Sequence, residues 1–138
     1  MFSRVRDIED RKGACLRVSM SAHPGGTVVT LERRDQPHRP SAQLSLSGAE
    51  ILSGFLMSAR LSAPYAMPDE AAEGPFAARF RLNCLPDARV VIEPEDSFPL
   101  SIDAQLWDRL YAELCLVVAH GRALAHREPT YGCVGVLH

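Results

Sequence analysis

The sequence predicts an α+β domain of two tandem ββ(β)α repeats, in which antiparallel strands precede one amphipathic helix in each repeat. Three observations support this prediction. Residues 16–24 (Leu-Arg-Val-Ser-Met-Ser-Ala-His-Pro) correspond to residues 78–86 (Ala-Arg-Phe-Arg-Leu-Asn-Cys-Leu-Pro). Both segments alternate apolar and polar residues, which is typical of half-buried strands. Residues 49–52 correspond in turn to residues 104–107, and each opens a stretch with apolar residues at helical spacing.

The composition is that of an ordinary globular protein. The chain has 138 residues, of which 46% are hydrophobic and 23% are charged, and this length predicts a single domain over residues 1–138. A formal net charge of -2 provides no overall attraction to nucleic acid or anionic lipid. No stretch approaches the roughly 18 apolar residues of a membrane span, and the charged residues 1–7 do not resemble a secretory signal. We therefore expect a cytoplasmic protein that has no membrane partner.

Metal, cofactor and catalytic motifs are not apparent in the sequence. The four cysteines lie far apart, without a C-x-x-C pair: Cys15, Cys84, Cys115 and Cys133. This spacing favours free thiols in a reducing compartment over a zinc site. The carboxylates of residues 93–96 and of the helix that follows are scattered, which is typical of surface charge. We expect no cofactor and no metal, and the sequence favours a protein that is not an enzyme.

The first repeat is predicted to begin at about residue 15. Residues 1–13 are charged and have no regular apolar period, so we expect a loose arm or a solvated edge there. Residues 15–21 and 27–31 are predicted to form an antiparallel hairpin, because the His-Pro-Gly-Gly between them favours a turn. Residues 43–46 alternate as a short third strand.

A helix is predicted to close the first repeat at about residue 61. Ser47 and Glu50 have the S-x-x-E spacing of a capping box, in which each side chain accepts from the other's backbone N–H. Apolar residues then recur on one side of the helix at Ile51, Leu52, Phe55, Leu56 and Ala59. Residues 62–75, rich in proline, alanine and acidic residues, are predicted to be a linker.

The second repeat is predicted to span about residues 76–127. Residues 76–83 alternate and pair with residues 89–93 across a Leu-Pro-Asp-Ala turn, and a short edge strand is expected near residues 98–100. Ser101 or Asp103 is expected to cap the second helix.

The sequence is consistent with two C-terminal ends for the second helix. It ends at Gly121, or it continues to Arg127 before Pro129 stops it. The tail over residues 128–138 is predicted to be either a last strand at residues 133–137 or disordered.

This order of elements over residues 15–125 resembles the PC4 and Whirly group of single-stranded nucleic-acid-binding folds. In that group curved antiparallel strands precede a helix, and two such units pair. The segment Leu100–Trp107 is similar to the strand-to-helix junction of PC4-like proteins. The resemblance implies a domain that binds single-stranded nucleic acid through a basic strand face.

Candidate contact residues lie on the predicted polar strand faces: Arg17, Arg79, Arg81 and Arg89. If the two repeats share one sheet, these arginines merge into a surface for phosphate, nucleic acid or an acidic partner. The other interpretation is a solvated face whose arginines pair with acidic residues such as Glu32 and Glu93. Stacking of single strands needs aromatic residues beside the charge, whereas Phe76 and Phe80 are predicted to point to the apolar side.

The function that the sequence favours is that of a small non-enzymatic module acting through protein–protein contacts. Its partner is then an unknown protein or a second copy of the chain, by self-association. The alternative is a nucleic-acid-binding domain of PC4/Whirly-like architecture. Trp107 and Tyr111 are predicted to pack in the core, and an exposed anchor for another subunit is the second interpretation of this pair.

Overall fold

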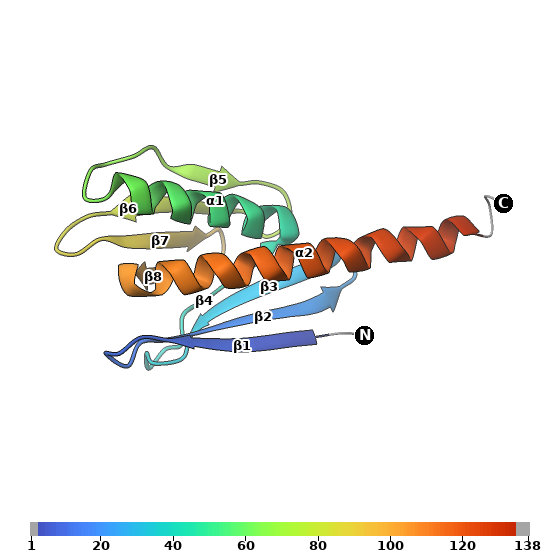
Figure 1. Cartoon of the computed structure of the whole chain (residues 1–138), viewed down its shortest axis with the longest axis horizontal. Coiled ribbons are helices and arrows are strands. Elements are labelled where there is room, and N and C mark those ends of the chain that lie inside the picture. The colour runs from blue at the N-terminus through green and yellow to red at the C-terminus, as the bar shows by residue number, and fades with distance from the viewer. Residues whose placement is uncertain (1–2, 135–138) are drawn as a thin grey trace.

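The computed structural model describes residues 3–134, which form two four-stranded antiparallel sheets and two helices (Figure 1). The elements of the first half are β1 (Ser3–Glu9), β2 (Cys15–His23), β3 (Gly26–Arg33), β4 (Ser41–Ser45) and α1 (Leu46–Ser62). Those of the second half are β5 (Glu70–Ala72), β6 (Ala78–Asn83), β7 (Arg89–Pro94), β8 (Leu100–Asp103) and α2 (Ala104–Val134). In each sheet, strands that follow one another in sequence are hydrogen-bonded neighbours.

The alternating strands are confirmed, and their apolar residues face the interior. In β2 the buried side chains are Leu16, Val18 and Met20, and in β6 they are Ala78, Phe80 and Leu82. Their cross-strand partners in β3 and β7 are buried as well, except for Pro94, which lies opposite Ala78 and is half-buried. Each sheet therefore has one apolar face that needs cover.

The helices provide that cover together. α1 contacts β5 and β6 of the second sheet as well as β3 and β4 of its own half, while α2 contacts β1 and β3 of the first sheet as well as β8. The two helices also pack against each other, side by side (Figure 1). One contiguous cluster of buried apolar residues consequently spans both halves of the chain.

The strand β1 corrects the expectation of a loose arm at residues 1–13. It pairs along its whole length with β2, and Ile8 is its buried apolar side chain. Arg4 and Arg6 lie on the same face of β1 as Ile8, where a half-buried strand usually has apolar residues. Their side chains form ion pairs with Glu113 of α2 instead. The apolar period that identifies a half-buried strand is therefore missing from this one.

Each half therefore has four strands before its helix, where the sequence predicted three. The additional strand of the second half is β5, which lies inside the predicted linker of residues 62–75. Its Glu-Ala-Ala sequence has low strand propensity, so pairing with β6 and contact with α1 stabilise it.

The cap of α1 lies two residues before the predicted one. Ser45 is the N-cap, and its hydroxyl oxygen accepts a hydrogen bond from the backbone N–H of Gly48 at 3.0 Å. Ser47 lies inside the helix, so the predicted capping box with Glu50 is wrong. The helix begins earlier because strand β4 ends at Ser45, and Leu46 already packs toward α2.

The second helix extends beyond both of its predicted C-terminal ends. α2 continues past Gly121 and Pro129 to Val134, so the alternative strand at residues 133–137 is wrong for Cys133 and Val134 and otherwise lies outside the described residues. A Cβ atom on Gly121 would lie 2.7 Å from Leu46 Cδ2, which shows that this glycine serves the crossing with α1. Within the described part of the chain, neither helix has the length and apolar character needed to cross a bilayer.

Candidate functional site

The four candidate arginines do not share one strand face. Arg17 lies on β2 of the first sheet, whereas Arg79 and Arg81 lie on β6, and Arg89 on β7, of the second. The side chains of Arg79 and Arg81 are exposed, and that of Arg17 is half-buried. The single surface expected from a shared sheet is thus divided between two sheets.

Three of these arginines pair with carboxylates of the same chain. Arg17 donates two hydrogen bonds to Asp7, from Nε to Oδ1 at 2.8 Å and from Nη2 to Oδ2 at 3.1 Å. This pairing lowers the pKa of the Asp7 carboxyl. Arg81 lies 3.3 Å from Glu93, and Arg79 lies 3.9 Å from Asp69. Much of the positive charge on the strand faces is therefore balanced locally.

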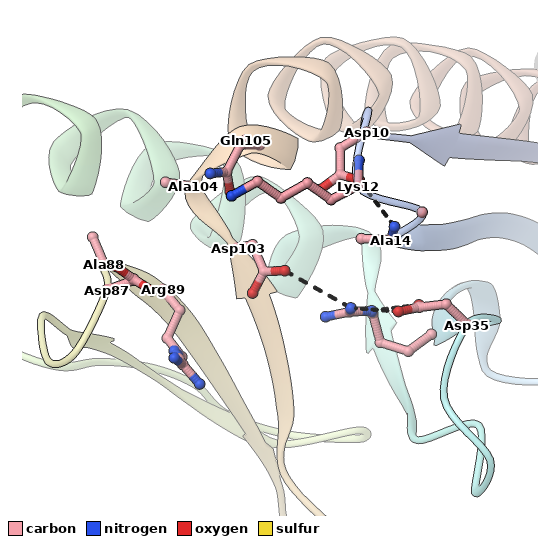
Figure 2. A pocket seen from close by; sticks show the side chains of 12 residues that line it. Asp10, Lys12, Ala14, Asp35, Asp87, Ala88, Arg89, Asp103, Ala104 and Gln105 are labelled. Carbon is pink, nitrogen blue, oxygen red and sulfur yellow. Dashed lines mark hydrogen bonds and ion pairs between the residues drawn. The ribbon is translucent and has the colours of Figure 1, made fainter.

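Arg89 lines a polar cleft of about 760 Å³ between the ends of the two sheets (Figure 2). The cleft is bordered by the β1–β2 turn, the end of β3, the β6–β7 turn and the start of α2. Its charged lining residues are Asp10, Lys12, Arg33, Asp35, Asp87, Arg89 and Asp103. The buried Nε of Arg89 has no hydrogen-bond partner among the described residues, and its cross-strand neighbour is Asp103. Cationic and anionic side chains thus line the same cleft.

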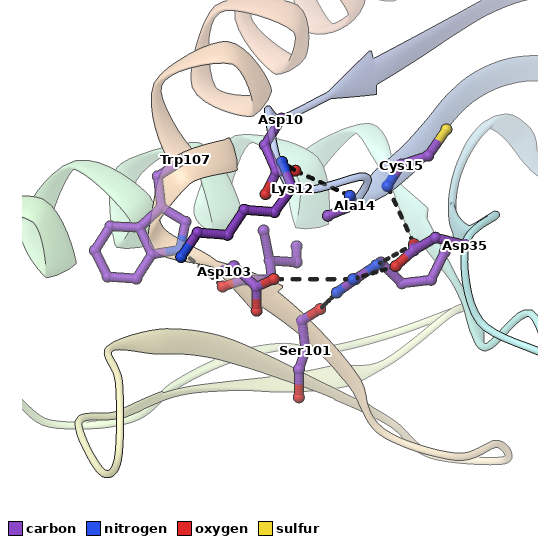
Figure 3. A network of polar contacts seen from close by, with 10 residues as sticks. Asp10, Lys12, Ala14, Cys15, Asp35, Ser101, Asp103 and Trp107 are labelled. Carbon is purple, nitrogen blue, oxygen red and sulfur yellow. Dashed lines mark hydrogen bonds and ion pairs between the residues drawn. The ribbon is translucent and has the colours of Figure 1, made fainter.

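Buried Arg33, which also lines this cleft, joins the two sheets through a network of polar contacts that includes Asp35, Ser101 and Asp103 (Figure 3). Its Nε and Nη2 donate to the two carboxylate oxygens of Asp35 at 2.9 and 2.8 Å. Its Nη1 donates to the backbone carbonyl of Ser101 on β8 at 2.6 Å, and Asp103 lies 3.9 Å from Nη2. Arg33, the last residue of β3, therefore supplies a donor to the Ser101 carbonyl on β8, which is the edge strand of the second sheet. An unpaired carbonyl at this edge would be costly.

The electrostatics of this network favour a permanent ion pair. The hydrogen bonds from Arg33 are the main cause that lowers the pKa of the Asp35 carboxyl to about 2, and the backbone N–H of Cys15 also contributes. The same pairing raises the pKa of Arg33. Asp35 is consequently ionised at neutral pH, and its ion pair is unsuited to proton transfer there.

The chemistry available in the cleft is limited in other ways. Among residues 3–134 with described side chains, no three His, Cys, Asp or Glu residues are grouped to hold a metal ion. Asp10 already accepts hydrogen bonds from the backbone N–H groups of Lys12 and Ala14. Burial is the main cause that raises the pKa of the nearby Cys15 thiol, which disfavours the reactive thiolate. In this cleft it is Arg33 that joins the two halves, through its contacts with Ser101 and Asp103.

A different surface lies on the outer face of α2, which we define by Ala112, Leu116, Ala119 and Ala123. All four side chains are exposed, and Leu116 is 56% exposed. Cys115 is exposed beside them. The opposite side of the same helix bears Leu110 and Leu114, which are fully buried.

The α2 outer face was not among the predicted sites. A signal for it exists in the run Leu114–Ala119, because six consecutive apolar residues cannot all lie on one side of a helix. Trp107 is buried and its Nε1 donates to the carbonyl of Ile102 at 2.9 Å, which confirms its predicted place in the core. Tyr111 is half-buried.

A second group of exposed apolar residues lies where α1 ends. Leu61, Tyr65 and Leu85 are each more than three-quarters exposed. The thiol of Cys84 lies 3.8 Å from the carbonyl of Tyr65, so the loop after α1 lies against the β6–β7 turn. Large apolar side chains are thus exposed on loops as well as on α2.

No protein-family model matches this chain, and no curated protein sequence matches it either. The surfaces described above are therefore the basis for proposing a function.

Proposed function

We propose that this protein is a non-enzymatic module that acts through protein–protein contacts, with the α2 outer face as its contact surface. The observation that carries this proposal is Leu116, an apolar side chain that is 56% exposed in the middle of a well-formed helix. Covering a leucine side chain is worth roughly 1.5–3 kcal/mol when its burial is complete. Alanines on both sides of Leu116 extend the apolar surface along the helix.

The charged regions of the protein are less suited to binding a partner than the α2 outer face. The arginines of β2 and β6 have acidic neighbours, and the cleft contains four carboxylates beside three cationic side chains. An acidic ligand would have to displace the carboxylates that pair with Arg17, Arg79 and Arg81, and in the cleft it would lie beside carboxylates such as Asp87 and Asp103. An apolar partner on α2 displaces only water.

Photo-crosslinking tests the proposal. A photoreactive amino acid at position 116, in the full chain expressed in its own cells, should give a covalent product with another protein chain. Position 98 is the matched control, because Phe98 is also an exposed apolar side chain and lies between β7 and β8. A product at position 116 that is missing at position 98 supports the proposal, and no product at position 116 contradicts it.

The second candidate function is binding of single-stranded nucleic acid. The observation that favours it is the order of elements, four antiparallel strands followed by a helix in each half, together with the resemblance to the PC4 and Whirly group. On this hypothesis the halves are tandem structural repeats, and Arg79 and Arg81 contact phosphates. A fold by itself does not determine a function, so this candidate ranks second.

Titration of labelled single- and double-stranded oligonucleotides separates the two candidates. We expect no binding tighter than about 10⁻⁴ M at physiological salt, because the net charge is -2 and the strand-face arginines are paired. A micromolar complex that weakens with salt, and that is lost in the Arg79→Ala/Arg81→Ala variant, would establish the second candidate instead.

A further inference from the structure

The proposed contact surface belongs to a layer of two helices. α1 and α2 run side by side, and in Figure 1 neither helix is covered by another element on the side toward the viewer. The exposed residues of α1 include the small Ser47, Gly54 and Ser58, whereas Glu50 and Arg60 form ion pairs with Arg122 and Asp108 of α2. On the side toward α1, the contact surface is therefore bordered by these two ion pairs.

The apolar residues of the α2 outer face have the spacing of a helix–helix seam. Successive members are separated by four, three and four residues, which is the a/d spacing of a coiled coil: Ala112, Leu116, Ala119 and Ala123. A seam of this kind matches another helix in preference to a strand or an irregular peptide. Leu116 is then the large side chain, and the alanines form the shallow positions that receive it.

Two charged side chains beside this seam, Asp108 and Arg122, are self-complementary, and the exposed Arg109, in line with Leu116, donates a hydrogen bond to the backbone carbonyl of Glu9. Asp108, Cys115 and Arg122 follow one another at intervals of seven residues, so they lie in one line along the helix. The negative and the positive side chain are equally far from Cys115, at about 10 Å along the helix axis. A line of this kind complements its own copy when that copy runs in the opposite direction.

We propose that the partner of the α2 outer face is a second copy of this chain, bound with its α2 antiparallel about a twofold axis at Cys115. This inference rests on the proposed function and names the partner. In this arrangement Asp108 of each copy faces Arg122 of the other, and the two Cys115 side chains meet at the axis. Leu116 packs against Ala112 of the second copy, and the contact is the same from both sides.

The existing ion pairs of these residues are compatible with the second contact. Asp108 lies 3.3 Å from Arg60, and Arg122 lies 2.6 Å from Glu50, both on α1. The side chains of Asp108 and Arg122 remain 67% and 51% exposed, so each retains hydrogen-bonding capacity for another partner. A parallel arrangement would place Asp108 opposite Asp108 and Arg122 opposite Arg122, so like charges disfavour it.

The available area sets the expected affinity. α1 has 17 residues and is about 25 Å long, and over that length two adjacent helices about 10 Å wide offer roughly 500 Å² per copy, below the about 800 Å² of a standard interface. We therefore expect a reversible dimer that dissociates in the micromolar range.

Charge exchange tests the arrangement in the purified full chain. Sedimentation equilibrium should show a monomer–dimer equilibrium, and Asp108→Arg or Arg122→Asp should each weaken it roughly tenfold, because like charges then meet twice per dimer. The double variant Asp108→Arg/Arg122→Asp should restore the affinity to within about threefold of the wild type. Asp7→Arg is the matched control on β1 and should leave the dimer unchanged. Thermal unfolding of every variant verifies that these exposed substitutions keep the fold.

Cysteine oxidation tests the position of the axis. A variant that retains Cys115 as its one cysteine should form a disulfide-linked dimer under mild oxidation, and a variant that retains Cys84 alone should not. A protein that stays monomeric into the high micromolar range, or a dimer that the double variant does not restore, overturns the inference. If the same monomeric protein still crosslinks another protein through position 116, the proposed function stands without this partner.

Discussion

Arg33 and Leu116 invert the usual positions of their residue types, because Arg33 is 4% exposed and Leu116 is 56% exposed. The difference between them lies in their partners. Arg33 has polar partners from β8 and from the chain just after β3, so its charge is already used within the fold. Leu116 has half of its surface in water. The charges around Arg33 are therefore paired within the fold, whereas the exposed surface of Leu116 is not covered by another described residue.

The largest expected effect contrasts two leucines of α2. Leu110→Ala should cost about 2–5 kcal/mol in the free energy of unfolding, because it removes fully buried contacts and leaves a cavity. Leu116→Ala, the same change on the opposite side of the helix, should cost less than about 0.5 kcal/mol. Urea denaturation at low protein concentration, where association does not contribute, measures both. Equal costs would show that Leu116 is buried in the monomer and would remove the contrast.

The second effect concerns the connection between the sheets. Arg33→Ala should cost about 2–4 kcal/mol, because it leaves the Ser101 carbonyl and the Asp35 carboxylate without their donor. Arg17→Ala is the matched control and should cost much less, because its ion pair with Asp7 is exposed to solvent. A cost at Arg33 no larger than that at Arg17 would mean that the network does not hold the halves together.

The smallest effect is a dependence on pH. The pKa of Asp35 is lowered from 3.8 to about 2 in the folded protein, so its stabilising contribution is complete above about pH 4 and is lost as the pH falls toward 2. Because this side chain is partly exposed, we expect a loss of about 1 kcal/mol. The difference in unfolding free energy between wild type and Asp35→Asn should shrink over this range. A constant difference from pH 5 to pH 2 would contradict the pairing with Arg33.

Much of the fold follows from local patterns. The alternation in β2, β3, β6 and β7 and the apolar sides of both helices are properties of neighbouring residues. The four strands form close to where the pattern predicts them, while α1 begins earlier and α2 ends later than predicted. The α2 outer face could be predicted in part from the sequence, because the run Leu114–Ala119 has more apolar residues than one side of a helix can hold. Which of those residues stays in water depends on where the sheets lie.

By itself, the sequence determined the periods: two for the strands, 3.6 for the helices, and turns at glycine and proline. Where the inward-facing residues of a strand are charged, only the tertiary structure shows that the strand packs against the rest of the fold. The partners of those charged residues are remote in the chain. Arg4 reaches Glu113 across 109 positions, and Arg33 reaches Ser101 across 68. A local window reads Arg4 as a solvated residue, since the carboxylate that it contacts lies on a helix near the other end of the chain. For the same reason, only the packed structure shows that Arg33 is buried and that Leu116 is exposed.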